Sequence, residues 1–139
     1  MDYYYKEFSK LQEEFHDVMH EYPLFREDID EIEEKRIKEI NELIDKNDEY
    51  YFKKAIDKLK DLINYIKDTS NCIKKQYDNF DKLAKAWEKK ELSKNVDIAK
   101  INIQVKKANE LIKSHKINDL IEANKIMEEL IKIKWIIIN

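Results

Sequence analysis

The sequence predicts an all-α protein: an antiparallel bundle of about six helices built on two related helical hairpins. The 139 residues include no glycine and one proline, so few positions can supply the left-handed turns that strands and phosphate loops need. Apolar residues make up 42% of the chain and charged residues 41%, and the apolar ones recur three and four positions apart, which favours helix throughout. The third observation is an internal repeat, residues 37–63 and 105–131.

The two copies of the repeat align at an offset of 68 residues without a gap. Identical residues occupy matched positions at Asn41–Ile44 and Asn109–Ile112, at Ala55 and Ala123, and at Leu62–Ile63 and Leu130–Ile131. Each copy reads as a helix that ends near a polar tetrad, a tight turn and a second helix. At this length we expect residues 1–139 to form a single helical domain.

The first three helices are expected before residue 69. The first has an aromatic stripe that includes Tyr4, Phe8 and Phe15 and stops at Pro23. The second begins among acidic residues near Glu27, where the helix dipole favours negative charge. The third spans roughly 49 to 68, and the polar side chains of residues 68–71 can cap the next helix, so we expect the chain to turn there.

Three further helices are expected after that turn. The fourth, about 72 to 92, repeats apolar residues in a near-heptad that includes Ile73, Phe80 and Trp87. The fifth covers 96 to 114, and the sixth begins near Asn118. Because Ala55 and Ala123 hold matching places in the two hairpins, we expect close backbone approach at both.

Charge is unevenly distributed along the chain. Residues 1–68 carry 12 Lys and Arg against 20 Asp and Glu, whereas residues 72–116 carry 12 against 6. We expect helices of opposite sign to pack side by side in the bundle. The lone Cys72 cannot form an internal disulfide, which fits a cytoplasmic protein, and no signal peptide or membrane span is recognisable.

Residues that could carry chemistry do not form a recognisable site. His16 and His20 have the spacing of zinc helices, but no third ligand is evident, and Glu13 with His16 is a single instance of a motif that di-iron bundles use twice. Cys72 has no histidine near it in the sequence. Without glycine there is no phosphate-binding loop. We therefore expect no enzyme activity, no metal and no cofactor.

A basic segment offers an alternative function. Lysines and aromatic residues alternate over residues 72–116, as they do on nucleic-acid-binding surfaces. However, Tyr77, Phe80 and Trp87 fall on the stripe expected to be buried, and arginine is scarce. A small nucleic-acid-binding protein that uses the 72–116 face is thus the second reading.

One family resemblance accompanies the repeat. The similarity covers roughly residues 30 to 135 and is carried by Tyr51–Leu62, Phe80 with Trp87, Lys107–Ile112, Asn118–Leu120 and Met127–Leu130. These stretches resemble the C-terminal helical extension of DnaK-like heat-shock chaperones. The resemblance implies a helical accessory module of a chaperone, without an ATPase of its own.

Together these observations predict a non-enzymatic helical protein-interaction module. Its partner would be a protein, with a chaperone or a client as one option, and a homodimer is left open. The residues expected to contact the partner are Tyr4, Trp87, Trp135, Ile136, Ile137 and Ile138. Tyr3 and Tyr5 would join them if exposed.

Overall fold

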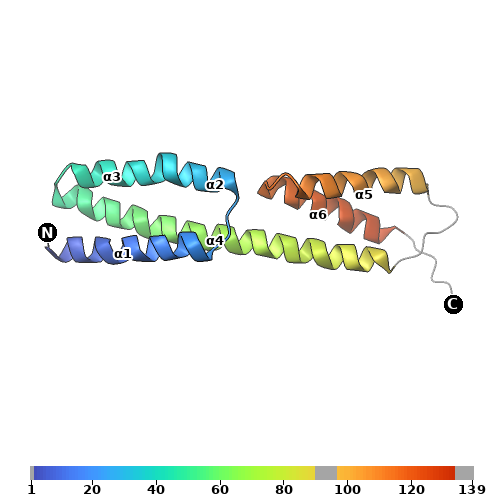
Figure 1. The fold of residues 1–139 in the computed structure, drawn as a ribbon, viewed down its shortest axis with the longest axis horizontal. Coiled ribbons are helices and arrows are strands. Elements are labelled where there is room, and N and C mark those ends of the chain that lie inside the picture. The colour runs from blue at the N-terminus through green and yellow to red at the C-terminus, as the bar shows by residue number, and fades with distance from the viewer. Residues whose placement is uncertain (1, 90–96, 134–139) are drawn as a thin grey trace. The chain divides into compact units, whose positions relative to one another are not determined.

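The computed structural model describes residues 2–89 and 97–133, and every regular element within these ranges is a helix (Figure 1). In chain order the elements are α1 (Asp2–Glu21), α2 (Arg26–Glu31), the π-helical turn η1 (Ile32–Arg36), α3 (Ile37–Asp45), α4 (Glu49–Glu88), α5 (Ile98–Ile112) and α6 (Ile117–Lys132). The all-α prediction is confirmed. Because α2, η1 and α3 follow one another without a break, the described ranges hold five continuous helical segments, whereas about six were expected.

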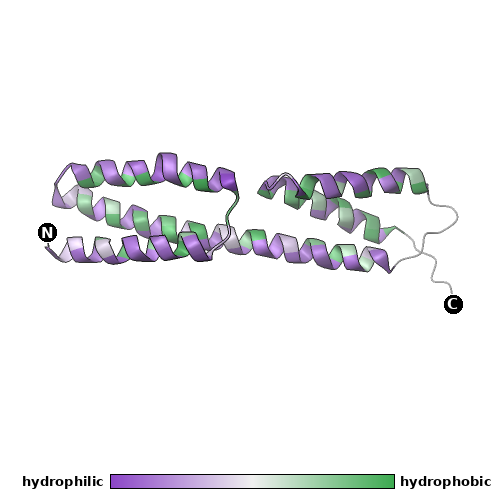
Figure 2. Cartoon of the chain, viewed as in Figure 1, coloured by the Kyte–Doolittle hydropathy of each residue, from purple (hydrophilic) through white to green (hydrophobic). Residues whose placement is uncertain are grey.

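The contacts group the chain into two compact units: unit 1 (Met1–Ile73) and unit 2 (Lys74–Asn139). In unit 1, α1 and α3 lie alongside the first part of α4 (Figure 1). Hydrophobic residues recur between hydrophilic ones along each helix (Figure 2), and those that face inward form the core. Its buried members include Phe8, Leu11, Val18, Ile32, Ile40, Phe52, Ala55, Leu59, Leu62 and Ile66.

The π-helical turn η1 follows from the spacing of two core residues. Ile32 is fully buried, and Ile37, five positions later, packs against the same core. In an α-helix, positions five apart lie on different faces. A turn that holds one additional residue, as η1 does, brings both isoleucines to the core side.

The turn expected at residues 68–71 is wrong, since α4 continues through these residues as helix. Apolar residues recur every seven positions along α4 without a change of phase, at Phe52, Leu59, Ile66, Ile73, Phe80 and Trp87. A break at 68–71 would disturb that phase. The capping side chains predicted there are instead exposed or half-buried in the helix, except for Ser70, which is fully buried.

In unit 2, α5 and α6 pack with the remainder of α4. The core contains Phe80, Ile101, Ala108, Ala123, Ile126, Met127 and Leu130. A buried amide completes it: Asn124 on α6 accepts a hydrogen bond from Asn79 Nδ2 at 2.8 Å and donates to the Gln76 carbonyl at 3.1 Å. Asn124 also donates to Leu120 O at 3.0 Å, so its buried amide is satisfied from both helices.

Two helix-to-helix turns use non-glycine residues in the left-handed region. Asn47 has a φ of 52° between α3 and α4, and His115 has a φ of 57° between α5 and α6. Asn and His are among the residues that tolerate this conformation best after glycine. The chain therefore closes both turns without a glycine.

The two charged segments fall in different units. The acidic segment 1–68 belongs to unit 1, whereas all the lysines of residues 72–116 belong to unit 2. Opposite charges do meet inside unit 1, where lysines of α4 reach acidic residues of α1 and α3. The ion pairs are Lys60 with Glu7 at 3.0 Å, Lys67 with Glu14 at 3.3 Å and Lys58 with Glu39 at 3.5 Å.

Candidate functional site

The contact residues predicted from the sequence fall in three places. Tyr4 is half-buried in unit 1, packed against the core, with its ring 5.5 Å edge-on from the Tyr3 ring. Trp87 is half-buried against the core of unit 2. The segment Trp135–Ile138 lies outside the described residues. Among these residues, Tyr4 lies at the beginning of α1.

Five tyrosines gather at one end of unit 1, which we name the tyrosine end: Tyr3, Tyr4, Tyr5, Tyr50 and Tyr51. α1 begins at this end, and α3 turns into α4 at the same end (Figure 1). The two segments meet where the Tyr5 ring lies 4.8 Å from the ring of Phe52. Tyr3, Tyr50 and Tyr5 are 71%, 59% and 50% exposed, so much of their aromatic surface is in contact with water.

Lysines lie against the rings of the tyrosine end. Lys46 Nζ is 4.0 Å from the centroid of the Tyr51 ring, Lys54 Nζ is 4.7 Å from that of Tyr50, and Lys53 Nζ is 5.3 Å from that of Tyr4. A hydrogen bond with Tyr4 raises the pKa of Lys53, and one with Tyr50 raises the pKa of Lys54. The charged lysines favour defined ring positions, and the end as a whole offers aromatic area beside hydrogen-bond donors.

A second surface of unit 1 is a groove between α1 and α3, about 260 Å³ in volume, which we name the α1/α3 groove. Phe8 and Phe15 of α1 and Ile37 and Ile40 of α3 form its apolar walls, and Leu59 of α4 lies between them. Gln12, His16 and Asn41 also line it and are exposed at its rim. The groove can accept apolar side chains, and its polar rim restricts how they enter.

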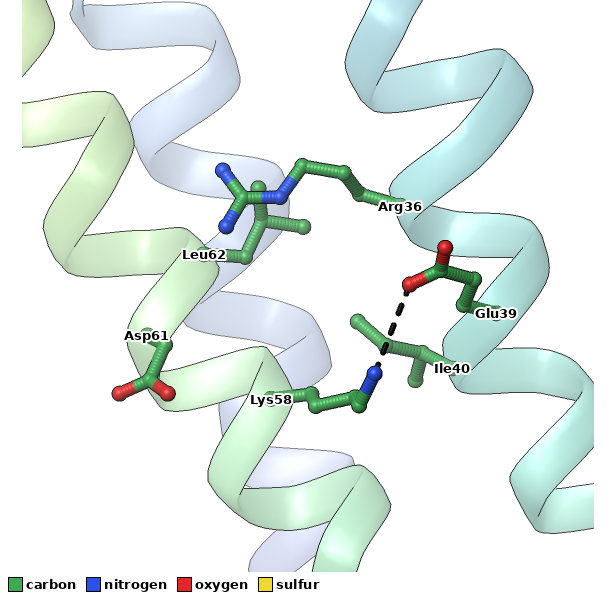
Figure 3. Close-up of a pocket in the computed structure, with 6 residues that line it drawn as sticks. All are labelled: Arg36, Glu39, Ile40, Lys58, Asp61 and Leu62. Carbon is green, nitrogen blue, oxygen red and sulfur yellow. Dashed lines mark hydrogen bonds and ion pairs between the residues drawn. The ribbon is translucent and has the colours of Figure 1, made fainter.

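A third hollow, about 250 Å³, lies between α3 and α4 (Figure 3). Its lining has two cations, Arg36 and Lys58, and two anions, Glu39 and Asp61. Lys58 pairs with Glu39 at 3.5 Å, and the Arg36 guanidinium stacks 4.5 Å from the centroid of the Tyr65 ring. The charges balance and are already engaged in part, so this hollow has no excess charge with which to select an ion.

The residues considered for chemistry do not assemble in the described ranges. The rings of His16 and His20 are 4.6 Å apart on the exposed side of α1, whereas His115 lies in the turn between α5 and α6. The described residues contain no group of three or more His, Cys, Asp or Glu side chains that could hold a metal. Cys72 is exposed on α4. Within the same ranges, no helix combines the length and apolar character that crossing a bilayer requires.

The basic segment contributes an exposed lysine face to unit 2. Lys75 and Lys82 on α4, and Lys89 directly after it, recur every seven positions and are exposed. Two of the aromatic residues between them face the core: Phe80 is 7% exposed and belongs to the core, and Trp87 packs against it, whereas Tyr77 is half-buried. Cationic side chains are therefore available on this face, but the rings of Phe80 and Trp87 are engaged with the core.

Only part of the tyrosine end was predicted from the sequence. Tyr3, Tyr4 and Tyr5 are among the predicted contact residues, but Tyr50 and Tyr51 are not. Their proximity follows from the directions of the helices. If α3 runs antiparallel to both α1 and α4, then α1 and α4 begin at the same end, and residues 2–5 lie near residues 49–52. Comparison with family models, with curated proteins and with solved structures finds no match to this chain.

Proposed function

We propose that the chain is a non-enzymatic, cytoplasmic helical protein-interaction module that contacts its partner through the tyrosine end. The observation that carries this proposal is the convergence of exposed aromatic rings from two separate segments, with Tyr3, Tyr50 and Tyr5 each at least half exposed. Tyrosine is enriched at protein interfaces and at the residues that dominate binding energy. A rigid helical support orders these rings before binding, which lowers the entropic cost of association.

Two related hairpins, 37–63 and 105–131, are part of the proposal. Equivalent residues Asn47 and His115 both have positive φ, and equivalent hydrogen bonds begin α4 (Phe52 N to Asp48 O, 2.9 Å) and α6 (Leu120 N to Lys116 O, 3.0 Å). Ala55 and Ala123 are both fully buried, as expected for close helix approach. These correspondences support a duplicated supporting unit, on which one copy has gained the tyrosine end.

Because of the resemblance to DnaK-like chaperones, a chaperone or one of its clients is the first partner to test. The experiment places a photo-crosslinking amino acid at position 50 of the intact chain, with position 64, an exposed asparagine on the same helix, as the control. We expect a discrete adduct with one protein from position 50 and none from position 64. Adducts of equal yield at both positions would contradict a role for the tyrosine end.

Quantitative binding to the identified partner then tests individual residues. We expect Tyr3→Ala combined with Tyr50→Ala to weaken binding by about tenfold or more, because exposed aromatic anchors dominate such interfaces. Asn64→Ala serves as the matched control and should leave affinity unchanged. Equal affinity of the tyrosine variant and the control would refute the proposal.

A second candidate function is nucleic-acid binding by unit 2. Residues 74–139 carry 15 Lys and Arg against 10 Asp and Glu, and the exposed lysine face of α4 supports this reading. Such binding would be largely electrostatic and would fall steeply with salt concentration. Retention on immobilised single-stranded nucleic acid over a salt series tests it, with Lys75→Ala combined with Lys82→Ala as the variant expected to lower retention.

A further inference from the structure

The α1/α3 groove has the form of a site for one more helix. Its walls are two helices that both pack on α4, and the space between them is lined by Phe8, Phe15, Ile37, Ile40 and Leu59. A helix laid along such a groove can insert side chains spaced three and four residues apart into the gap. An extended strand would leave its backbone donors and acceptors facing apolar walls without partners. The geometry therefore favours a helical occupant.

Both walls of the groove carry more acidic than basic residues, which favours an occupant of positive charge. α1 carries 2 lysines against 6 acidic residues, and residues 26–45 carry 4 Lys and Arg against 9 acidic residues. Some acids face α4, where Glu7, Glu14 and Glu39 pair with its lysines. These pairs, together with that of Asp30 and Arg26 at 3.1 Å, involve only part of the acidic residues of the two walls.

Two of the remaining acids adjoin the rim of the groove. Glu13 is three positions before His16, and Asp45 is four after Asn41, so each shares a helix face with a lining residue. Both are exposed, and neither forms an ion pair with another described residue. Lys38 lies at the same rim and offsets them in part. We propose that the α1/α3 groove binds a basic amphipathic helix of a protein partner.

This inference deepens the proposed role as a protein-interaction module but uses a different surface from the tyrosine end. The two can fail separately. Tyr3→Ala combined with Tyr50→Ala should leave binding at the groove unchanged, since neither residue lines it. If the tyrosine variant abolishes groove binding, the two surfaces are not independent and the inference is overturned.

The test measures fluorescence anisotropy of labelled peptides mixed with the intact chain. The probe is an amphipathic peptide of about five helical turns with leucines on one face and lysines on the other. One control peptide replaces the lysines with glutamates, and a second replaces the leucines with serines. We expect the leucine and lysine peptide to bind at least about tenfold more tightly than either control, with affinity falling as salt rises. Equal binding of the lysine and glutamate peptides would overturn the proposal.

Charge-reversed variants locate the binding on the chain. Glu13→Lys combined with Asp45→Lys should weaken binding of the lysine peptide by about tenfold and strengthen binding of the glutamate peptide. The matched control, Glu21→Lys combined with Glu31→Lys, changes the net charge equally but acts at exposed positions of the same two helical segments that lie five or more residues from the groove lining. Circular dichroism verifies that both variants fold. Equal losses in the two variants would indicate unspecific attraction and would refute a site at the groove.

A second copy of this chain is the competing occupant. Light scattering of the intact chain over a concentration series, with and without Gln12→Trp at the groove rim, separates the two cases. A monomer throughout, with peptide binding lost in Gln12→Trp, supports a partner helix. A dimer that Gln12→Trp dissociates would assign the groove to self-association and overturn the proposal.

Discussion

Replacing Ser70 with alanine tests whether α4 continues unbroken through residues 68–71. Ser70 is fully buried, and its hydroxyl has no hydrogen-bond partner in the described part of the chain. A buried polar group without a partner costs about 1 to 3 kcal/mol. Alanine is also a better helix former than serine by about 0.5 kcal/mol. We therefore expect Ser70→Ala to raise the free energy of unfolding by about 1.5 kcal/mol or more.

If residues 68–71 formed a capped turn, Ser70→Ala would change the free energy of unfolding in the opposite direction. In that arrangement the serine hydroxyl would accept a hydrogen bond from the first turn of the next helix. Its removal would then lower the free energy of unfolding by about 0.5 to 2 kcal/mol. The sign of the change, rather than its size, thus distinguishes a continuous helix from the turn that the sequence predicts.

Urea unfolding followed by far-ultraviolet circular dichroism measures the change. Asn71→Ala is the matched control, because Asn71 is exposed and in a continuous helix its replacement gains only helix propensity, about 0.5 kcal/mol. We expect both variants to be stabilised, and Ser70→Ala more than Asn71→Ala. A loss of stability in Ser70→Ala, or a larger gain in the control, would refute the account of Ser70 as an unsatisfied buried hydroxyl in a helix.

Three further predictions concern packing and protonation. Asn124→Ala should lower the free energy of unfolding by about 2 kcal/mol, because it removes the buried partner of Asn79 and Gln76, whereas exposed Asn118→Ala should change it by less than about 0.5 kcal/mol; urea unfolding measures both. Ala55→Leu and Ala123→Leu should each lower the free energy of unfolding by about 1 to 3 kcal/mol, because leucine overpacks these buried sites. Urea unfolding measures the change, with exposed Ala99→Leu as the control, and equal stability of all three variants would contradict close packing at the two alanines. Burial, then repulsion from Glu31 and Glu27, raises the pKa of Asp28, so the folded state binds this proton more tightly than the unfolded state. Asp28→Asn should therefore stabilise the protein at neutral pH, and the gain should vanish as pH falls through the raised pKa to below the ordinary one; a gain that grows on acidification would contradict this sign.

Periodicity predicted much of the fold because burial in a helical protein follows spacing. The core stripes of α1, α3 and α6, the proline that ends α1 and the polar tetrads at 45–48 and 113–116 are all local features of the chain. Capping chemistry was less informative. Residues 68–71 could cap a helix, but the seven-residue phase from Phe52 to Trp87 is better satisfied by a continuous one. Tertiary packing outweighs a local preference of this size.

The candidate surfaces were harder to predict because each joins separate segments. Tyr5 and Phe52 meet only after α3 has turned back into α4, and the α1/α3 groove needs the separation of two helices, which no single stretch encodes. The Asn124 amide gave no signal either, since an asparagine on a helix is usually exposed. Asn124 can be buried because Gln76 and Asn79 on α4 form hydrogen bonds with its side chain.

The distribution of charge in unit 1 separates stability from recognition. Ion pairs between exposed side chains contribute little to stability, and lysines of α4 form such pairs with the inner acids Glu7, Glu14 and Glu39. The remaining acids of α1 and α3 repel one another and lower stability slightly. A hydrophobic core that runs from Phe8 to Ile66 tolerates that cost, because apolar burial is the dominant favourable term. Retaining unpaired acids beside an apolar groove therefore brings no advantage to the isolated fold, and it becomes favourable only when a cationic partner occupies the groove.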